Sequence, residues 1–494
     1  MKLILALLSA IQCHPPASSS RPPVFLEDRF DVSPAFQIRT VPGTQRLLST
    51  PKLAVPALVD LVSVSCSVIR HPILFLMALP TLSDKAAGET KAQGSDDWPS
   101  WRGPGGQGVG ERHANPPERW SATEGIAWTT ELKGWGNSSP IISGDRLYIT
   151  SQGDDDSLLV YSLDRDGGAI VWERNAGKGR LKTHVLHNMA TPTPVSDGEH
   201  VWALFGTGDL ICLSRTGETL WSRNLATDHG EYKILWGMGS SPRLYGGLLY
   251  TICLHSGPSY VLAIDKLTGK DVWKVDRKVP CRDEASDSYS SPVILESAGR
   301  VELLVSGCDH ISAYDPLFGK ELWTSAGLKI EHKYGRTMAS PGVGEGIVVA
   351  CSASMQGLGK AIAVRAGGTG DVTESRRLWQ YEKFTPDCPT PLVYQGHAYL
   401  VRDDGIATCL DAKTGEVRWH KRIGRGTFKA SPVAAAGRVY FAAESGDCIV
   451  AKAGPDDVVI AENHLDSSFT ATPALVGNRI YLRSRSKVIA VGKR

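Results

Sequence analysis

Four histidines lie in polar stretches of the chain, and imidazole is a common metal ligand. His184 and His187 are three residues apart, whereas His229 and His332 lie in two later stretches. A defined zinc site also needs cysteine, carboxylate or further histidine ligands at short spacing, and no such spacing accompanies these residues. We therefore predict no metal site and interpret the four histidines as solvated loop residues; a metal cluster is the alternative.

The same stretches carry aromatic and cationic side chains, which favour binding of a partner over catalysis. An aromatic residue comes shortly before several Ser-Pro or Thr-Pro dipeptides, and aromatic side chains contribute large contact areas at interfaces. We predict one binding face, which comprises Trp135, His184, His187, Trp236, Tyr289, Tyr334, Arg336, Phe428 and Phe469.

Motifs of familiar catalysts are absent or incomplete. The glycines of residues 103–108 match G-x-G-x-x-G, but they follow no predicted strand and precede Asn115-Pro116-Pro117, which does not open a helix. We interpret them as a loop. The sequence contains no G-x-S-x-G, H-E-x-x-H or protein-kinase signature. We predict no catalytic residues.

The elements that carry the predicted binding face follow from a repeat of about 50 residues. Each unit opens with Ser-Pro or Thr-Pro, runs through an apolar segment, passes Asp-x-x-x-Gly and closes at a tryptophan, most clearly in residues 263–273 and 408–419. The opening prolines are Pro140, Pro194, Pro242, Pro292, Pro341, Pro391, Pro432 and Pro473. The closing tryptophans are Trp172, Trp221, Trp273, Trp323, Trp379 and Trp419. Such a period, filled with short β-type runs, is typical of a β-propeller.

We predict an all-β, eight-bladed propeller of four-stranded antiparallel blades. The seventh unit is degenerate, with Val458-Val459-Ile460 in place of a tryptophan-bearing strand, and the eighth ends before its last strand. Residues 126–132 carry the tryptophan of a closing strand without a preceding blade, so we expect them to complete the eighth blade and remove two open sheet edges. Seven blades are the alternative if the degenerate unit is not a full blade.

Tryptophans at one repeated position predict packing between neighbouring blades. The cysteines form no Cys-x-x-Cys. Cys212, Cys409 and Cys448 fall on predicted third strands, and Cys253, Cys308 and Cys351 fall at the ends of second strands. We interpret them as small buried hydrophobic residues, with disulfides as the alternative.

Residues 1–96 form a separate signal and linker region, and residues 97–494 form the propeller. Apolar segments begin at Leu3 and at Pro72, each after a basic residue, as in signal peptides. We expect a translated start placed too early, the second segment as the working signal and no membrane span in the mature protein. The formal net charge is +2, and without a basic stripe it predicts no nucleic-acid binding.

The Ser/Thr-Pro opening, the Ala-x-Asp-x-x-Thr-Gly segment and the closing tryptophan resemble the PQQ-like repeat of quinoprotein-type propellers. That superfamily includes quinoprotein alcohol dehydrogenases and the assembly lipoprotein BamB. The segment Asp97-Trp98-Pro99-Ser100-Trp101-Arg102-Gly103-Pro104 resembles the start of exported repeat proteins that are abundant in planctomycete bacteria.

The resemblance implies a choice between two functions. Dehydrogenases of the family use adjacent cysteines near the quinone and carboxylates around Ca²⁺, but no two cysteines are adjacent here and no acidic loop has calcium spacing. We therefore predict an exported, non-catalytic binding or scaffold propeller, monomeric and without a cofactor. Its partner would be an envelope protein or peptide, or a small ligand at the channel, where the loops between blades gather; the aromatic side chains could instead only plug the channel. The alternative is a periplasmic oxidoreductase that uses PQQ with Ca²⁺ on an alcohol or sugar.

Overall fold

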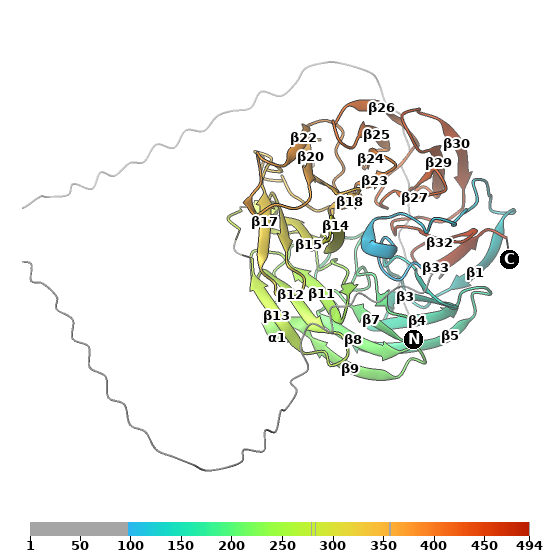
Figure 1. Cartoon of the computed structure of the whole chain (residues 1–494). Helices are drawn as coiled ribbons and strands as arrows, with labels where there is room; N and C mark the ends of the chain where they lie inside the picture. Colours follow the sequence, from blue (N-terminus) through green and yellow to red (C-terminus); the bar gives the residue numbers. More distant parts are fainter. Residues whose placement is uncertain (1–96, 278, 282, 355–356, 494) are drawn as a thin grey trace, which may run out of the picture. The chain divides into compact units, whose positions relative to one another are not determined.

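The computed structural model describes residues 97–493 except 278, 282, 355 and 356. Their strands form eight sheets, seven of four strands and one of five, arranged as a ring (Figure 1). In each sheet four strands run antiparallel from the centre of the ring outward, and the five-stranded sheet adds a short parallel strand at its outer edge. The predicted eight-bladed all-β propeller is therefore confirmed.

The strand bounds follow the repeat. Blades one to four comprise β2 (Ile141–Ser143), β3 (Arg146–Gln152), β4 (Ser157–Asp164) and β5 (Ile170–Lys178); β6 (Val195–Ser196), β7 (His200–Leu204), β8 (Asp209–Ser214) and β9 (Thr219–Asn224); β10 (Arg243–Tyr245), β11 (Leu248–Cys253), β12 (Tyr260–Asp265) and β13 (Asp271–Asp276); and β14 (Val293–Ser297), β15 (Arg300–Gly307), β16 (His310–Tyr314), β17 (Glu321–Ser325) and β21 (Gly370–Asp371). Blades five to eight comprise β18 (Gly342–Gly344), β19 (Ile347–Ala353), β20 (Gly359–Arg365) and β22 (Arg377–Tyr381); β23 (Leu392–Tyr394), β24 (His397–Val401), β25 (Ile406–Asp411) and β26 (Val417–Arg422); β27 (Val433–Ala435), β28 (Arg438–Ala442), β29 (Asp447–Lys452) and β30 (Val459–His464); and β31 (Ala474–Val476), β32 (Arg479–Arg483), β33 (Lys487–Val491) and β1 (Ile126–Glu131).

The short helices lie outside the blades. They are α1 (Leu225–His229) and the 3₁₀ turns η2 (Pro104–Gly106) and η3 (Asp283–Ser286). In the described part of the chain, no helix has the length and apolar character needed to cross a bilayer.

The ring closes through the N-terminal strand, as predicted. β1 pairs antiparallel with β33, so that Trp128 lies opposite Ala490 and Thr130 lies opposite Val488. The degenerate seventh unit is a full blade, because β30 supplies its fourth strand. Pairing β1 with the C-terminal strands leaves the eighth blade with the same four strands as its neighbours.

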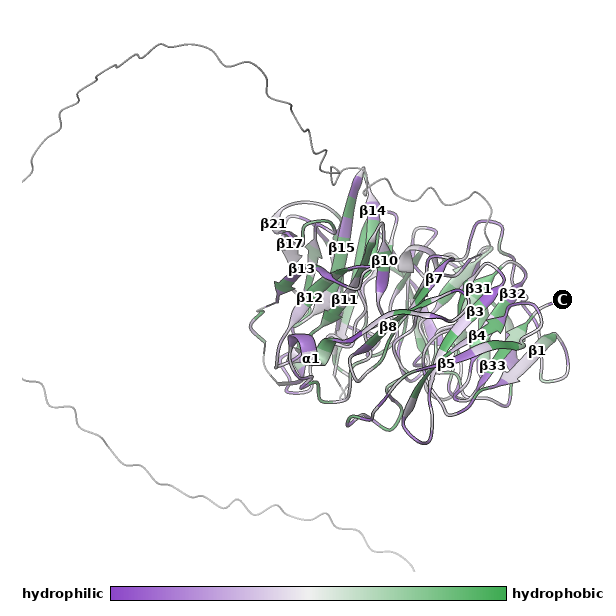
Figure 2. Ribbon diagram, turned by 90° about the horizontal axis from the view of Figure 1, so that it is seen from below, coloured by the Kyte–Doolittle hydropathy of each residue, from purple (hydrophilic) through white to green (hydrophobic). Residues whose placement is uncertain are grey.

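The core lies between the blades and along their middle strands. β12 is buried over almost its whole length, whereas outermost β13 is largely exposed. In Figure 2 the hydrophobic residues, in green, lie mainly in the strands. Cys212, Cys409 and Cys448 are buried and unpaired in β8, β25 and β29, which confirms their interpretation as small core residues.

Most closing tryptophans contact the turn between the third and fourth strands of the next blade. The indole N–H of Trp379 donates to the carbonyl of Ala412 at 2.9 Å. Gly415 of that turn has φ of 74°, and a Cβ there would lie 2.5 Å from the Trp379 ring. The same indole-to-turn hydrogen bond is made by Trp128, Trp172, Trp221, Trp273 and Trp419. The repeat therefore pairs a tryptophan with a glycine because the ring needs a surface without a side chain.

Two junctions depart from this pattern. After blade seven, β30 carries no tryptophan, and after blade four the tryptophan is used differently. Trp323 of blade four is fully buried and donates to Glu302 of its own blade at 3.0 Å. The third and fourth strands of blade five are joined by a longer connection, and within it β21 pairs in parallel with β17. This insertion takes the place of the short glycine turn.

Ser and Thr of the opening dipeptides link the inner ends of the blades. The backbone N–H of Ser139 donates to the hydroxyl of Thr193 at 2.9 Å, and that of Thr193 donates to Ser241 at 3.0 Å. The same contact repeats from blade to blade as far as Thr472. The dipeptide thus combines a hydroxyl acceptor for the preceding blade with a proline that fixes the start of the inner strand.

Residues 98–110 fill the centre of the ring, where Figure 1 shows the blue segment with η2. Trp98 forms a bridge with Ile142 of β2. Arg102 is fully buried and donates to the carbonyls of Pro391 at 3.0 Å and Pro432 at 3.1 Å. The glycine run is therefore a packed plug rather than a phosphate cradle, and this plug, not the aromatic side chains predicted for the binding face, fills the centre.

Candidate functional site

The antiparallel order of each blade places its connections on two faces of the ring. We call the face with the connections between blades, together with those between second and third strands, the loop face. The opposite face carries the first-to-second turns and the Asp-x-x-x-Gly turns, and we call it the turn face. Every residue of the predicted binding face lies in a connection on the loop face.

Two neighbouring connections of the loop face meet through His184 and Trp236. Their rings lie edge to face with centroids 5.6 Å apart, and Lys182 Nζ lies 5.9 Å from the centre of the Trp236 ring. The backbone N–H of His184 also donates to the carbonyl of Trp236 at 3.4 Å. Apolar neighbours in the same connections are exposed. We call the group the rim patch, and it consists of Leu181, Lys182, His184, Val185, Leu235 and Trp236.

His187 lies below this surface. Its Nδ1 is 2.6 Å from the hydroxyl of Thr191, and its Nε2 atom is buried without a hydrogen-bond partner. Burial lowers the pKa of His187 to about 4, so the ring is neutral at physiological pH. We therefore assign His187 a packing role beneath the rim patch, against Gly237.

Several predicted aromatic residues are not available on the surface. Phe428 and Phe469 are fully buried in hydrophobic clusters, so including them in an exposed binding face was wrong. Tyr289 packs against the core between blades two and three, and its hydroxyl is buried. Trp135 is half-buried and is held by a bridge to Gln152, with Arg485 5.1 Å from its ring centre. An aromatic residue just before the Pro dipeptide therefore faces the ring interior more often than we predicted.

Arg336 joins three connections of the loop face through ion pairs. Its guanidinium contacts Asp387 at 2.6 Å through Nη2 and at 3.2 Å through Nε, and Nη1 contacts Glu284. The Arg336 side chain is 12% exposed, and these acidic partners raise its pKa against the effect of burial. Tyr334 lies nearby in sequence, with Lys333 4.7 Å from its ring centre. Arg336 is thus a structural clamp within the predicted face.

A second charged group continues from Asp387. Asp403 accepts from the backbone N–H of Asp387 at 3.2 Å and is paired with Lys429, whose Nζ lies 3.7 Å from Cys388 Sγ. Asp387, Cys388 and Asp403 are close enough to share an ion. This group was not among the residues predicted from the sequence, although Asp387 and Lys429 come shortly before a Pro dipeptide.

These residues do not fit the Ca²⁺ and quinone pair of the family dehydrogenases. Calcium requires six to eight oxygen ligands, whereas here Arg336 and Lys429 already neutralise the two carboxylates. Burial raises the pKa of the Cys388 thiol well above its ordinary value, which keeps it protonated and a poor ligand. The candidate ion group of the described residues contains none of the four loop histidines.

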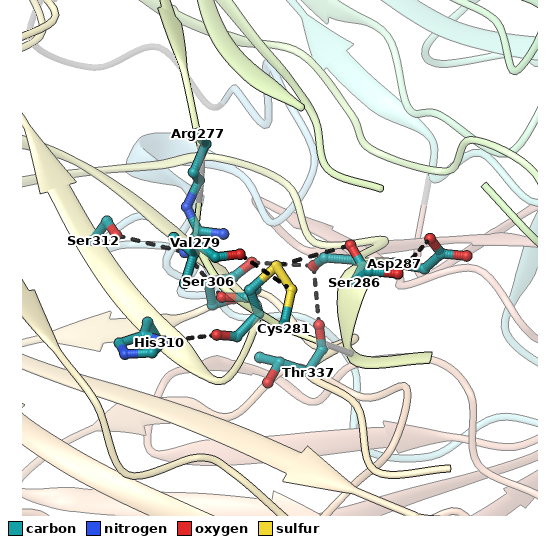
Figure 3. The surroundings of a disulfide bond; sticks show 12 residues. Arg277, Val279, Cys281, Ser286, Asp287, Ser306, His310, Ser312 and Thr337 are labelled. Atoms are coloured by element: carbon teal, nitrogen blue, oxygen red, sulfur yellow. Dashed lines mark hydrogen bonds between the residues drawn. A yellow bond between two sulfur atoms is a disulfide. The ribbon is translucent and has the colours of Figure 1, made fainter. Parts of the chain in front are cut away.

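A disulfide ties two connections of blade four, as Figure 3 shows. Cys281 follows β13 and Cys308 follows β15, with Cα atoms 5.5 Å apart. The interpretation of Cys308 as an unpaired core residue was therefore wrong. Its position at the end of a second strand brings it next to the connection that enters the same blade.

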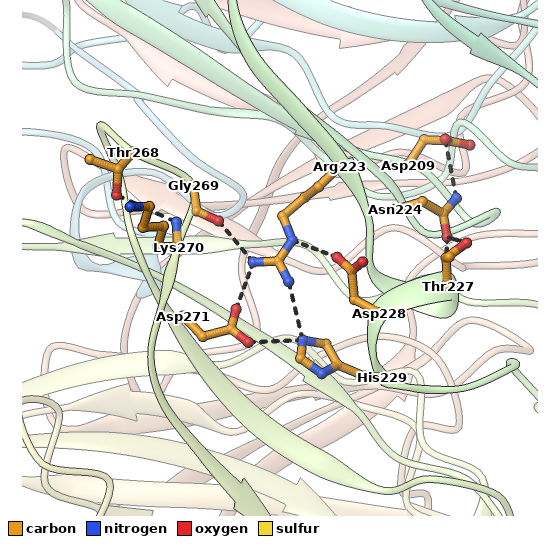
Figure 4. A network of polar contacts seen from close by, with 10 residues as sticks. All are labelled: Asp209, Arg223, Asn224, Thr227, Asp228, His229, Thr268, Gly269, Lys270 and Asp271. Atoms are coloured by element: carbon orange, nitrogen blue, oxygen red, sulfur yellow. Dashed lines mark hydrogen bonds and ion pairs between the residues drawn. The ribbon is translucent and has the colours of Figure 1, made fainter.

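A further polar network lies between blades two and three (Figure 4). Arg223 contacts Asp228 at 2.7 Å and Asp271 at 2.6 Å, and His229 Nε2 lies 3.3 Å from Asp271. The network fastens α1 to the first residue of β13, so His229 has a structural role there. The guanidinium of Arg223 is therefore paired with two aspartates.

Solved structures with the same architecture are distant in sequence. BamB from Moraxella catarrhalis is 17% identical, with a TM-score of 0.56, and the alignment covers 74% of this chain and 99% of that one. A europium-containing methanol dehydrogenase is 12% identical, with a TM-score of 0.57 and coverage of 78% and 89%. The quinohemoprotein alcohol dehydrogenase from Comamonas testosteroni is 13% identical, with a TM-score of 0.53 and coverage of 81% of each chain. These likenesses show the fold alone.

Comparison with curated proteins gave no match. A family model described as outer membrane protein assembly factor BamB matches residues 119–257 and 257–494. The matched residues span most of the chain and coincide with the eight blades. The protein therefore belongs to this family of PQQ-like β-propellers.

Proposed function

We propose that this protein is an exported, non-catalytic binding propeller that holds a protein or peptide of the cell envelope on its loop face. The observation that carries the proposal is the rim patch. Its side chains are 43% exposed at Leu181, 79% at Val185 and 40% at Leu235. Apolar side chains grouped on exposed loops are typical of interaction sites.

The composition of the rim patch indicates what it binds. Trp236 provides an aromatic surface, and Lys182 adds positive charge beside it. Lys233, in the same connection as Trp236, is also exposed. We therefore expect the partner to present apolar side chains together with acidic ones, as an extended segment or a loop.

Two further observations support an envelope protein without catalysis. The family model carries the description of an outer membrane assembly factor, and a disulfide between Cys281 and Cys308 suits an oxidising compartment. The carboxylates near Arg336 and Lys429 are committed to ion pairs, which favours a binding role over the quinone-dependent alternative. Reconstitution with PQQ and Ca²⁺ followed by dye reduction tests this point, and turnover would contradict it.

The binding role can be tested by site-specific photo-cross-linking. A benzophenone amino acid placed at Val185 should give one discrete adduct in cells of the native host. The matched control is Leu267, which is 58% exposed in an Asp-x-x-x-Gly turn on the turn face. No adduct at position 185, or the same adduct from both positions, would contradict the proposal.

Export can be tested by sequencing the N-terminus of the mature protein. The signal and linker region, residues 1–96, lies outside the described residues and remains a prediction. We expect the mature chain to begin between about Ala87 and Trp98, because Trp98 is fully buried in the propeller and Asp97 before it accepts from the backbone N–H of Gly144 at 2.9 Å. A mature protein that retains Pro22-Pro23-Val24 would contradict the assignment of the second segment as the signal.

A further inference from the structure

A pocket of about 760 Å³ opens on the loop face between blades three and four. It is formed by the connections before and after blade three, by the β11–β12 connection and by the β15–β16 turn. Its size lies within the range of small-ligand sites. Leu235, Pro258, Val279 and the Cys281–Cys308 disulfide supply an apolar lining.

The pocket also contains a buried guanidinium that forms no ion pair with a carboxylate of the described residues. Arg277 is 5% exposed. Its Nη2 donates to the carbonyl of Gly307 at 2.8 Å and to the hydroxyl of Ser312 at 3.5 Å, as seen beside the disulfide in Figure 3. Its Nε and Nη1 atoms are buried without hydrogen-bond partners. A buried cation without a counter-charge is costly unless a ligand supplies one.

Three acidic residues line the described part of the pocket, and each has a partner other than Arg277. Asp276 pairs with Lys274, and Glu284 pairs with Arg336. Asp287 accepts from the backbone N–H of Leu235 at 2.8 Å. Burial lowers the pKa of Arg277, and the opposing influence of Tyr314 and of the Glu321 carboxylate only partly offsets it.

His255 adds a second donor. Its Nδ1 accepts from the backbone N–H of Gly257 at 2.8 Å, so in the neutral ring the proton lies on Nε2. That Nε2 atom is buried and has no acceptor. Burial and nearby Lys233 lower the pKa of His255 to about 4, which keeps this neutral donor form at physiological pH.

The contrast with Arg223 shows that this arrangement is not general in the fold. Arg223 lies between blades two and three and contacts two aspartates (Figure 4). Arg277 lies between blades three and four with carbonyl and hydroxyl contacts only. We infer that the pocket is a binding site for a carboxylate attached to an apolar group, with Arg277 and His255 as its donors.

The same chemistry is presented by the free C-terminus of a peptide with an apolar last residue and by a free aliphatic acid. Three probes separate the sources in calorimetric titrations of the full chain: an N-acetylated tripeptide ending in leucine, its C-terminal amide, and hexanoate. We expect at least one of the two carboxylates, the peptide acid or hexanoate, to bind. If the natural ligand is a peptide C-terminus, the amide should bind at least about tenfold more weakly than the peptide acid. Hexanoate binding alone would assign the site to free acids.

Variants assign the binding to this pocket. We expect Arg277→Gln to weaken binding of the carboxylate by at least about tenfold, and His255→Gln to weaken it less. The matched control Arg223→Gln, outside the pocket, should bind as the wild type does. If Arg277→Gln does not fold, the wild-type probe series and His255→Gln still decide. Equal binding of acid and amide, unchanged binding by Arg277→Gln, or no binding of either carboxylate would overturn the inference. It goes beyond the proposed function: Leu235 borders both sites, but the probe titrations and the Arg277 and His255 variants report on the pocket alone.

Discussion

The two faces of the ring are built from the same repeat, but their contacts differ: those of the turn face recur from blade to blade, and those of the loop face do not. On the turn face, the indole N–H of a tryptophan donates to a backbone carbonyl of the next blade in the same way at junction after junction. On the loop face, each connection has its own contacts, such as the Arg336 clamp, the rim patch and the pocket beside the disulfide. Repeated contacts therefore hold the ring together, whereas the contacts that occur once mark the face that is free to acquire a function.

Removing the N-terminal strand should break the ring itself. Deletion of all residues before Gly134 removes β1 and the central plug, which exposes the edges of β33 and the inner strands. We expect an aggregated protein in size-exclusion chromatography because unpaired strand edges associate. Deletion of residues 1–96 alone serves as the control and should leave a monomer. A monomeric, equally stable chain without β1 would show that the closing strand is not needed.

Truncating a turn-face tryptophan should have the next largest effect. Trp379→Ala removes the ring that covers Gly415 and its hydrogen bond to Ala412. We expect the free energy of unfolding to fall by about 3–5 kcal/mol, measured by urea denaturation. A loss below about 1 kcal/mol would mean that the junctions do not carry the stability of the ring.

The contacts of the turn face could be predicted from the sequence, whereas those of the loop face could not. The turn face could be predicted because Trp379 and Gly415 recur at fixed spacing in successive units. Arg336 and Asp387 could not be paired, because a contact made once leaves no periodic signal. Phe428 was placed on the surface because an aromatic residue before a Pro dipeptide looks alike whether it points inward or outward.

On the loop face, the Arg336 clamp should carry a smaller share of stability. Arg336→Met leaves Glu284 and Asp387 half-buried without their cation, and we expect a loss of about 2–3 kcal/mol, by thermal or urea unfolding. The turn-face control Arg418→Met removes an exposed ion pair with Asp411 and should leave the unfolding midpoint almost unchanged. Equal effects of the two substitutions would remove this distinction between the faces.

The pH dependence of stability should show the buried histidine beneath the rim patch. Because burial lowers the folded-state pKa of His187 from 6.5 to about 4, the unfolded chain binds more protons in that window, and stability falls as the pH drops through it. Between about pH 7 and about pH 5 we expect His187→Asn to lose less stability than the wild type, by on the order of 1 to 2 kcal/mol. Asp287, whose pKa burial raises, acts in the opposite direction in both proteins, so the difference between them isolates His187. Parallel pH profiles would contradict this assignment.

The division between a binding face and a structural face is tested most directly by measuring unfolding and cross-linking on the same two variants. Both variants carry the photo-cross-linking residue at position 185, and the readouts are the melting temperature and the yield of the adduct. We expect Trp236→Ala to lose the adduct with little change in melting temperature, since Trp236 is half-buried at the rim patch. Trp379→Ala should lower the melting temperature but retain the adduct below its own transition. If the adduct yield follows the melting temperature in both variants, the loop-face residues only pack, and the division between a binding face and a structural face is wrong.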